Sequence, residues 1–289
     1  MKLVRFNEGR IGVVADERVI DITELVGESP EQWPPTGISR VIRDFEQWRP
    51  QIAARVAQGG GIALSEARLQ TPVPWPNKLI AYPVNYVDHA TEMSSVGFAN
   101  VKGFFLKANS SLIGAHDTIE LPDLPGRSVH HECELGIIIG KQGRMIAEQD
   151  ALDHIFGYAC LLDITVRGNE ERVMRKSYDT FTVVGPWVVT ADEVGDPSDL
   201  NMELWVNDET RQRATTRDLI VNIPKMIALA SAAATLYPGD IIATGTPAGV
   251  GPIVDGDRVR IRIDRVGEMT VPVRQSDLGA NFVFNRPAA

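Results

Sequence analysis

One segment of the sequence carries the strongest structural signal: His130-His131-Glu132-Cys133-Glu134-Leu135-Gly136-Ile137-Ile138-Ile139-Gly140. Its apolar second half predicts a β-strand over 132–140 that runs into the core. Alternate residues of a strand point to the same face, so Glu132 and Glu134 share one, with Cα atoms roughly 6.6 Å apart. Two carboxylates beside a buried strand are costly unless a cation neutralises them. The segment therefore predicts a core strand with a charged site at its start.

A third carboxylate lies in a similar setting. Asp163 follows the nonpolar run 156–162, and an acid at the end of a buried strand needs a partner. Three carboxylates would form an oxygen site suited to Mg²⁺, Mn²⁺ or Ca²⁺. Two other interpretations stay open. The two glutamates could lie on the solvated face of an edge strand, or His130 and Glu132 could join a distant histidine such as His154 in a 2-His-1-carboxylate Fe(II) centre.

The chain around this strand is mostly β. Beyond residue 77, strands are predicted at 78–82, 132–140, 157–164, 187–190, 202–206, 241–244, 258–263 and 269–273. Helices are predicted at 88–96, 147–154 and 224–236. Because no βαβ period recurs, we expect an α+β fold, predominantly β, built on a mixed and largely antiparallel sheet or roll.

The first seventy residues form a separate pattern. Short strands are predicted at 3–6, 11–14 and 19–22. A helix follows from Ile38, is interrupted by Pro50 and resumes over 52–56. Alternating prolines hold the segment 71–76 extended. We therefore expect a small N-terminal α/β domain over 1–70 and a larger domain over 71–289.

Composition excludes several classes of protein. The formal net charge of −9 is opposite to that of a nucleic-acid-binding protein, so nucleic acid is not an expected partner. No run approaches the roughly 18 apolar residues of a membrane helix, and the first residues lack the apolar core of a signal peptide. The two cysteines, Cys133 and Cys160, fit a reducing compartment. We expect a cytoplasmic protein with no membrane partner.

A histidine and a glutamate lie three residues apart in the predicted helix over 88–96. His89 and Glu92 would share a helix face, where the carboxylate fixes the histidine tautomer and raises its basicity. Such a pair can deprotonate water, although an ordinary surface pair has the same spacing. The small and polar residues between 94 and 100 predict a loop that could close over a ligand.

Two further segments could contact a substrate. Lys176 could polarise a carbonyl or carboxylate, or it could be a solvated surface lysine. The loop from Gly245 to Gly251 would let backbone amides approach an anion, but it lacks the Gly-Lys-Ser/Thr ending of a nucleotide-binding loop. As a bare pattern it could also be a turn.

Taken in order, these motifs resemble the fumarylacetoacetate hydrolase family. The ordered set comprises Asn85-Tyr86-x-x-His89-x-x-Glu92, Glu132-x-Glu134-Leu135, Gly157-Tyr158 to Asp163 with Arg167, Lys176-Ser177-x-Asp179-Thr180 with Gly185-Pro186, and Pro238-Gly239-Asp240 to Gly245-Thr246-Pro247-Ala248-Gly249-Val250-Gly251. The resemblance covers residues 77–275. The first seventy residues resemble the small N-terminal domain of longer bacterial members.

The resemblance implies a β-roll domain of mixed sheets that usually forms a homodimer, and it assigns roles to individual residues. The family's metal ligands match Glu132, Glu134 and Asp163, and its catalytic residues match His89, Glu92 and Lys176. Its substrate-binding positions match Tyr86, Arg167, Gly245 and Thr246.

The resemblance also implies a reaction. It points to a metal-dependent hydrolase that cleaves a carbon–carbon bond in a 2,4-dioxo acid, such as an acylpyruvate or a related ring-fission product of aromatic catabolism. The metal would stabilise the enolate that leaves, and His89, oriented by Glu92, would activate water. The substrate would be a small dicarboxylic or oxo acid. Decarboxylases, isomerases and hydratases on the same scaffold are the second hypothesis, and a non-catalytic protein that binds metal or a small acid is the third.

The sequence departs from the family pattern after Arg167. Gly168 and Glu170 stand where aspartate and glutamine are common. Both positions follow the predicted metal ligand Asp163 closely, so we expect these changes to affect substrate choice.

Overall fold

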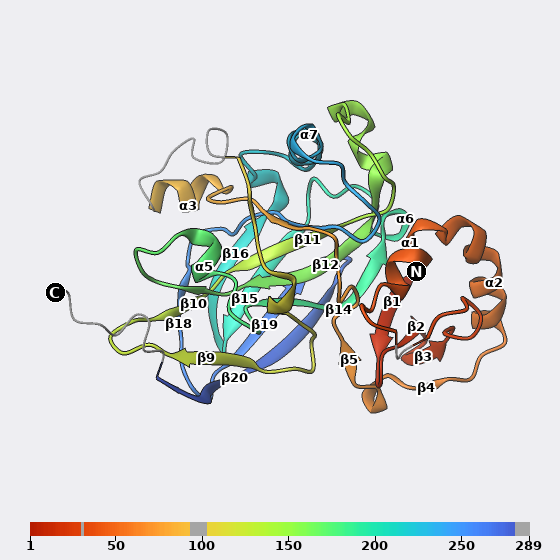
Figure 1. Cartoon of the computed structure of the whole chain (residues 1–289), viewed down its shortest axis with the longest axis horizontal. Coiled ribbons are helices and arrows are strands. Elements are labelled where there is room, and N and C mark those ends of the chain that lie inside the picture. Colours follow the sequence, from red (N-terminus) through yellow and green to blue (C-terminus); the bar gives the residue numbers. More distant parts are fainter. Residues whose placement is uncertain (30–31, 93–102, 281–289) are drawn as a thin grey trace.

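The computed structural model describes residues 1–29, 32–92 and 103–280. They form a strand-rich α+β fold in which a large sheet extends from the N-terminal segment into a β-roll (Figure 1). The predicted fold class is confirmed. The predicted loop over 94–100 and the second half of the predicted helix over 88–96 lie outside the described residues.

The large sheet has twelve strands, with the fully buried β11 and β12 near its middle. Its main path is β4-β3-β2-β1-β14-β12-β11-β17-β6-β7, with β5 beside β1 and β8 beside β14. The strands are β1 (Lys2–Phe6), β2 (Arg10–Ala15), β3 (Arg18–Asp21), β4 (Ile62–Ala63), β5 (Leu69–Gln70), β6 (Leu79–Ala81), β7 (Phe105–Leu106), β8 (Leu112–Ile113), β11 (Cys133–Ile139), β12 (Ile155–Asp163), β14 (Thr182–Thr190) and β17 (Ile241–Ala243).

Two smaller sheets complete the roll. A three-stranded sheet has the order β13-β10-β18, and a five-stranded sheet has the order β16-β15-β19-β20-β9. Their strands are β9 (Ile119–Asp123), β10 (Val129–His131), β13 (Thr165–Val166), β15 (Asn201–Val206), β16 (Glu209–Thr215), β18 (Gly251–Ile253), β19 (Arg258–Ile263) and β20 (Gly267–Ala280). The strict apolar alternation of β19 buries its valine and isoleucines and leaves the arginines on the outer face.

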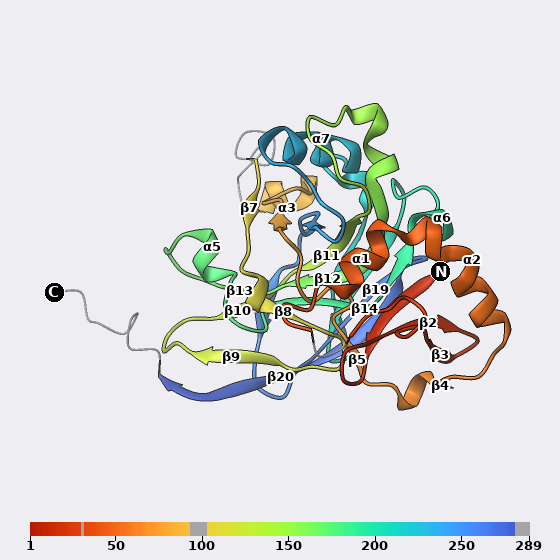
Figure 2. The ribbon, with the colours of Figure 1, turned by 45° about the vertical axis from the view of Figure 1, so that its right-hand side comes forward.

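Helices cover the sheets and fill the connections. In Figure 2, α7 lies over the central strands with η3 beside it. The α-helices are α1 (Gly37–Arg43), α2 (Phe45–Ala57), α3 (Val87–Glu92), α5 (Arg172–Arg175), α6 (Ala191–Val194) and α7 (Ile223–Ala233). The 3₁₀ helices are η1 (Leu64–Glu66), η2 (Asn109–Ser111), η3 (Glu148–His154) and η4 (Thr216–Asp218). Within the described ranges, no helix is both long and apolar enough to span a membrane.

Two helix predictions need correction. The N-terminal helix is broken at Asp44, whose backbone leaves the helical region, while Pro50 lies inside α2. Pro50 therefore costs α2 one backbone hydrogen bond without ending it. The predicted helix over 147–154 is the 3₁₀ helix η3, which begins one residue later.

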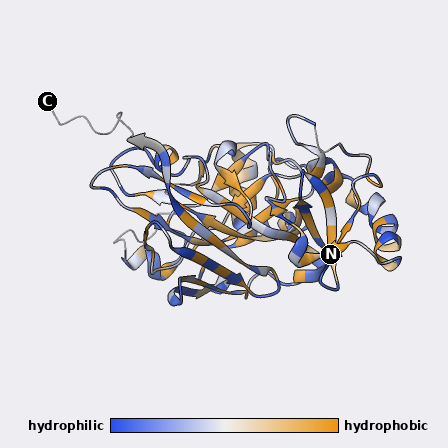
Figure 3. Ribbon diagram, turned by 90° about the horizontal axis from the view of Figure 1, so that it is seen from below, coloured by the Kyte–Doolittle hydropathy of each residue, from blue (hydrophilic) through white to orange (hydrophobic). Residues whose placement is uncertain are grey.

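One apolar core joins the N-terminal segment to the central sheet. Ile38 and Phe45 from the N-terminal helices belong to the same buried cluster as Phe156 and Leu161 of β12. The rings of Phe45 and Phe156 pack edge to face at 5.0 Å between centroids. Seen from below, apolar residues concentrate where the sheet layers meet (Figure 3). The division into domains at residue 70 stays a prediction.

Candidate metal and catalytic site

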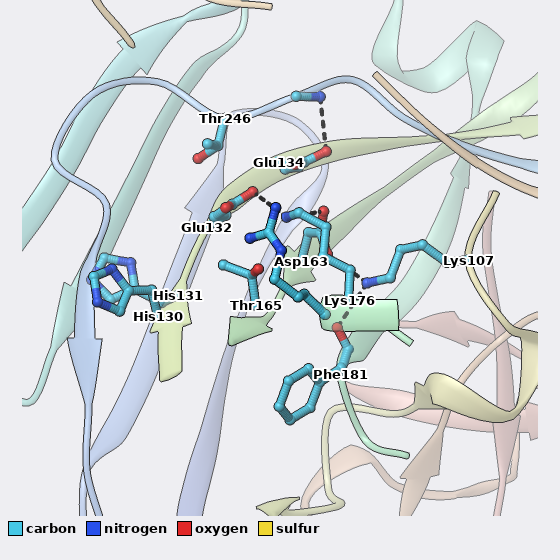
Figure 4. Close-up of polar contacts among 12 residues, drawn as sticks. Lys107, His130, His131, Glu132, Glu134, Asp163, Thr165, Lys176, Phe181 and Thr246 are labelled. Carbon is cyan, nitrogen blue, oxygen red and sulfur yellow. Dashed lines mark hydrogen bonds and ion pairs between the residues drawn. The ribbon is translucent and has the colours of Figure 1, made fainter. Parts of the chain in front are cut away.

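Strand register brings the three predicted metal ligands together. Cys133 of β11 pairs with Leu162 of β12, and the Asp163 N–H donates to the Glu132 carbonyl at 3.1 Å, so Glu132 lies opposite Asp163. Glu134 shares the face of Glu132 two residues along the strand. One carboxylate oxygen from each residue lies within 4.8 Å of the others, and all three side chains are buried (Figure 4).

Two buried lysines contact these carboxylates. Lys176 Nζ donates to Glu132 Oε2 and to Asp163 Oδ2, each at 2.7 Å. Lys107 Nζ donates to Asp163 Oδ1 at 2.5 Å and to the Phe181 carbonyl at 2.9 Å (Figure 4). Sequence reasoning missed Lys107. It follows the apolar run Phe104-Phe105-Leu106, and a charge directly after apolar residues is the signal that had singled out Asp163.

Burial and charge act in opposite directions on this cluster. Burial, and then the nearby Asp163 and Glu132 carboxylates, raise the pKa of Glu134 well above its ordinary value. Burial alone would raise the pKa of Asp163, but Lys107 and Lys176 outweigh it and lower that pKa. Burial would lower the pKa of Lys176, but Asp163 and Glu132 outweigh it and raise that pKa. The two lysines thus keep part of the acidic cluster ionised in the core.

The donor set fits a divalent cation. Three carboxylates converge in a buried site and offer hard oxygen ligands, as Mg²⁺, Mn²⁺ and Ca²⁺ prefer. The N–H of Gly245 donates to Glu134 Oε2 at 2.8 Å and so fixes one oxygen of that ligand. Orientation of a ligand by a neighbouring hydrogen bond is typical of metal sites.

A glycine is required where the loop after β17 meets Glu134. Gly245 has φ +92°, and a Cβ there would lie 2.7 Å from the Asn85 Cβ. A larger residue would be strained and would separate the N–H from Glu134. The next residue, Thr246, lines the cavity beside the carboxylates, and its Oγ1 accepts a hydrogen bond from Gln212 Nε2 at 2.8 Å.

The predicted histidine–glutamate pair forms on α3. His89 Nδ1 lies 2.9 Å from Glu92 Oε2. The histidine is buried and lines the same cavity as the three carboxylates, whereas the Glu92 side chain is 44% exposed. When the hydrogen resides on Nδ1 and is donated to Glu92, Nε2 keeps its lone pair and is the basic atom of the ring.

The cavity lining contains both acidic and basic side chains. Its lining residues are Tyr82, Pro83, Val84, His89, Phe105, Glu132, Glu134, Asp163, Thr165, Arg167, Arg172, Arg175, Lys176 and Thr246. Arg172 and Arg175 on α5 were not predicted from the sequence. Arg175 donates to two backbone carbonyls, those of Glu170 and Val166, at 2.8 and 3.3 Å.

Tyr86, a predicted substrate contact, lies away from the cavity. It is fully buried, its hydroxyl donates to the Met202 sulfur at 3.0 Å, and it is not among the cavity-lining residues. It belongs to the main buried apolar cluster of the core. This geometry does not support the predicted contact between Tyr86 and substrate.

The histidines near the cluster do not support the Fe(II) alternative. His130 Nδ1 accepts from Arg167 Nε at 3.1 Å, and its Nε2 lies 2.9 Å from Ser128 Oγ. Burial, and then Arg167, lower the pKa of His130 to about 4, so it is a neutral acceptor that holds the arginine. His154 is engaged with the Lys141 carbonyl. Over the described ranges, the group able to hold a metal contains the three carboxylates and no histidine.

The two departures from the family pattern form one unit with Arg127. The Arg127 guanidinium pairs with both carboxylate oxygens of Glu170 and donates to the Arg167 carbonyl. A Cβ at position 168 would collide with this guanidinium, so Gly168 leaves the space that it occupies. Gly168 makes room for the Arg127 side chain and Glu170 binds it, so both residues fix the segment after Asp163 against Arg127.

Comparisons with known proteins identify the family of this chain. The family model described as fumarylacetoacetate (FAA) hydrolase C-terminal matches residues 78–274. A maleylpyruvate hydrolase from Aquipseudomonas alcaligenes is 41% identical over 286 residues, which cover 95% of this chain and 99% of that protein. Oxaloacetate tautomerase YisK from Bacillus subtilis is 37% identical over 221 residues, or 72% of this chain and 73% of that protein.

A solved structure extends the likeness to the whole fold. The crystal structure of maleylpyruvate hydrolase from Sphingobium sp. SYK-6, in complex with manganese(II) and pyruvate, superimposes with a TM-score of 0.89. The two sequences are 57% identical, and the match covers 96% of this chain and 100% of that one. The chain therefore belongs to the fumarylacetoacetate hydrolase family.

Proposed function

We propose that this enzyme is a metal-dependent hydrolase that cleaves a carbon–carbon bond in an acylpyruvate-type 2,4-dioxo acid. One observation carries the proposal: three buried carboxylates with converging oxygens share a cavity with the His89–Glu92 pair. The similarity to two maleylpyruvate hydrolases supports the same class of reaction.

Glu132, Glu134 and Asp163 would hold the metal. A divalent cation there would act as a Lewis acid toward a 2-oxo acid and withdraw electron density from its carbonyl groups. The chain's own contribution is to hold the three oxygens together. Lys107 and Lys176 occupy other carboxylate lone pairs, and Gly245 fixes one oxygen of Glu134.

His89 is the proposed base. With Nδ1–H donated to Glu92, its Nε2 can take a proton from water, which then attacks the carbonyl distal to the carboxylate. The partly exposed Glu92 stabilises the positive charge that develops on the ring. Cleavage of the adjacent carbon–carbon bond then releases one acid and an enolate, and return of the proton from His89 to the enolate carbon gives the second acid.

Lys176, Thr246 and the arginines are the proposed substrate contacts. Lys176 Nζ lies between Glu132 and Asp163. It can donate a hydrogen bond to a substrate oxygen that lies beside these carboxylates. Arg167, Arg172 and Arg175 add three positive charges to the cavity lining. With a divalent cation on the three carboxylates, these positive charges would favour a substrate with a second carboxylate, that is, a dicarboxylic oxo acid.

We further propose that Mg²⁺, or alternatively Mn²⁺ or Ca²⁺, is the working metal, and that the enzyme is a cytoplasmic homodimer. Free, buried Cys133 and Cys160 fit a reducing compartment. We also propose residues 1–70 as an accessory domain and 71–289 as the catalytic domain, since the family model begins at residue 78.

The test is product analysis with the purified chain. Metal-free protein is loaded with Mn²⁺ or Mg²⁺ and given acylpyruvates with and without a terminal carboxylate. The proposal expects pyruvate and a second acid in equal amounts, loss of turnover on chelation, and recovery when metal is restored. Full activity after chelation would contradict it.

A second function on the same scaffold is isomerisation or tautomerisation of an oxo acid. The similarity to oxaloacetate tautomerase YisK favours this alternative. It differs in mass balance, because tautomerisation conserves the substrate mass and hydrolysis adds water. Decarboxylation would release CO₂, and hydration would give a single product. The same product analysis therefore separates all four reactions.

A further inference from the structure

Gln212 lies behind the cavity and reaches it from a different sheet. It is 2% exposed and belongs to β16 of the five-stranded sheet, whereas Glu134 lies on β11, Asp163 ends β12 and Glu132 directly precedes β11. Its Oε1 accepts from the Cys133 N–H at 2.9 Å and lies 3.2 Å from His131 Nδ1. Its Nε2 donates to Thr246 Oγ1 and to the Pro247 carbonyl, both at 2.8 Å.

These contacts fix the orientation of the amide. The Cys133 N–H can only donate, so the atom that faces it must be the oxygen of Gln212. The Pro247 carbonyl can only accept, so the atom that faces it must be the nitrogen. A flipped amide would lose both bonds and leave two buried backbone groups unpaired. Nε2 is therefore the donor to Thr246.

The direction of that bond determines what the Thr246 hydroxyl can do. Because its oxygen accepts from Gln212, its own hydrogen cannot be donated back to the same atom. In the parts of the chain that the structure describes, the bond from Gln212 is the one hydrogen bond that this hydroxyl makes. Thr246 lines the cavity next to Glu132 and Glu134, so the hydrogen is available to a ligand there (Figure 4).

We propose that Gln212 is a positioning residue that sets the Thr246 hydroxyl as a hydrogen-bond donor to a carboxylate of the substrate. The assignment rests on the proposed function for the kind of ligand, an oxo acid. It adds a role for a residue that does not line the cavity. The arrangement also ties the glycine-rich loop to β16, so the donor is in place before the ligand arrives.

The test is a double-mutant cycle on oxalate binding to the Mn²⁺-loaded protein, measured by titration calorimetry. Thr246→Val removes the hydroxyl and keeps the shape, and we expect binding to weaken at least about tenfold, as for a lost hydrogen bond to a charged group. Gln212→Met removes the amide, and the Thr246 hydroxyl can then turn toward the Pro247 carbonyl. We expect a loss of similar size.

The decisive measurement is the oxalate affinity of the double variant. Because both residues act through one hydroxyl, Gln212→Met should cause no further loss when Thr246 is already valine. With an acylpyruvate substrate, each single variant should raise KM and leave kcat nearly unchanged, since it removes binding common to ground and transition state. Thr246→Ser, which keeps the hydroxyl, should restore binding to near the wild-type level.

A second Gln212 variant covers the case in which the methionine does not fold. Gln212→Glu keeps the volume and still accepts from Cys133, but it presents an acceptor to Thr246 and should draw the hydroxyl hydrogen away from the ligand. Melting temperatures identify variants that fold. Gln142→Met, at an exposed glutamine, is the matched control and should bind oxalate as the wild type does.

Two results would overturn the assignment. One is wild-type oxalate affinity in a folded Gln212 variant. The other is a loss of oxalate affinity in the double variant that equals the product of the two single-variant losses. Failure of the proposed function gives a different result. A wild-type protein that binds oxalate through Thr246 and Gln212 but turns over no acylpyruvate would refute the hydrolase and leave this inference intact.

Discussion

Lys107 offers the sharpest test of the energetics of the site. Its side chain is fully buried, and its ammonium bonds to Asp163 and to the Phe181 carbonyl. Substitution by methionine keeps the length of the side chain and removes the charge. Asp163 would then keep Lys176 as its charged partner, and the Phe181 carbonyl would lose its bond to the ammonium. We expect the metal-free protein to be strongly destabilised.

The size of the effect follows from burial. Removal of one partner of a buried ion pair costs about 3–5 kcal/mol, and here Asp163 loses one of its two charged partners while the Phe181 carbonyl loses its bond to the ammonium. At about 2.1 cal/mol/K per residue, the 289 residues give an unfolding entropy of about 0.6 kcal/mol/K. The melting temperature of metal-free Lys107→Met should therefore fall by about 5–8 °C.

A bound cation should reduce this loss. Mn²⁺ held by Glu132, Glu134 and Asp163 would supply positive charge where the lysine is missing, so the deficit should be smaller in excess Mn²⁺ than in chelator. Thermal melting followed by circular dichroism measures both. Lys141→Met, at an exposed lysine, is the control and should change stability by no more than about 0.5 kcal/mol. An unchanged metal-free melting temperature, or equal losses with and without Mn²⁺, would refute the reasoning.

Three further outcomes are expected. Glu132→Gln should weaken Mn²⁺ binding by more than the roughly 10–100-fold that loss of a supporting residue costs, as titration calorimetry would show. His89→Gln should lower kcat about 10²- to 10⁴-fold while Mn²⁺ affinity stays at the wild-type level, which separates the base from the metal ligands. Glu170→Gln should lower the melting temperature at pH 6. The hydrogen bond from Arg127 lowers the pKa of Glu170 to about 2, so this stabilisation is present above pH 4.5 and the difference from wild type should disappear as the pH falls toward 2.

The strands of the core could be predicted because burial leaves a clear pattern in the sequence. The apolar runs of β11 and β12 and the alternation of β19 identify strands within one or two residues of their bounds. β20 was predicted over 269–273 but extends over Gly267–Ala280. Its polar second half pairs with β9, and that contact over a large sequence separation leaves no local pattern.

The site could be predicted as a set of residues but not as a geometry. Periodicity placed Glu132 and Glu134 on one face, whereas the position of Asp163 opposite Glu132 depends on the register between two strands. Gln212 could not be found, because its strand is polar at nearly every position and no alternation marks the buried one. The roles of Gly168 and Glu170 became visible only with Arg127, which lies about 40 residues earlier in the chain.

The pairing between β1 and β14 has a consequence for shorter versions of this chain. Lys2 lies opposite Val189 and Leu3 opposite Val188, so the first strand covers one side of an apolar central strand. Without the N-terminal segment, the backbone amides and carbonyls of Val188 and Val189 would lie unpaired at an exposed strand edge. Such an edge can pair with strands of other molecules and cause aggregation. A truncated enzyme would keep every residue of the proposed catalytic site. Its solubility would depend on a substitution that blocks pairing at that edge, such as a charged residue or a proline.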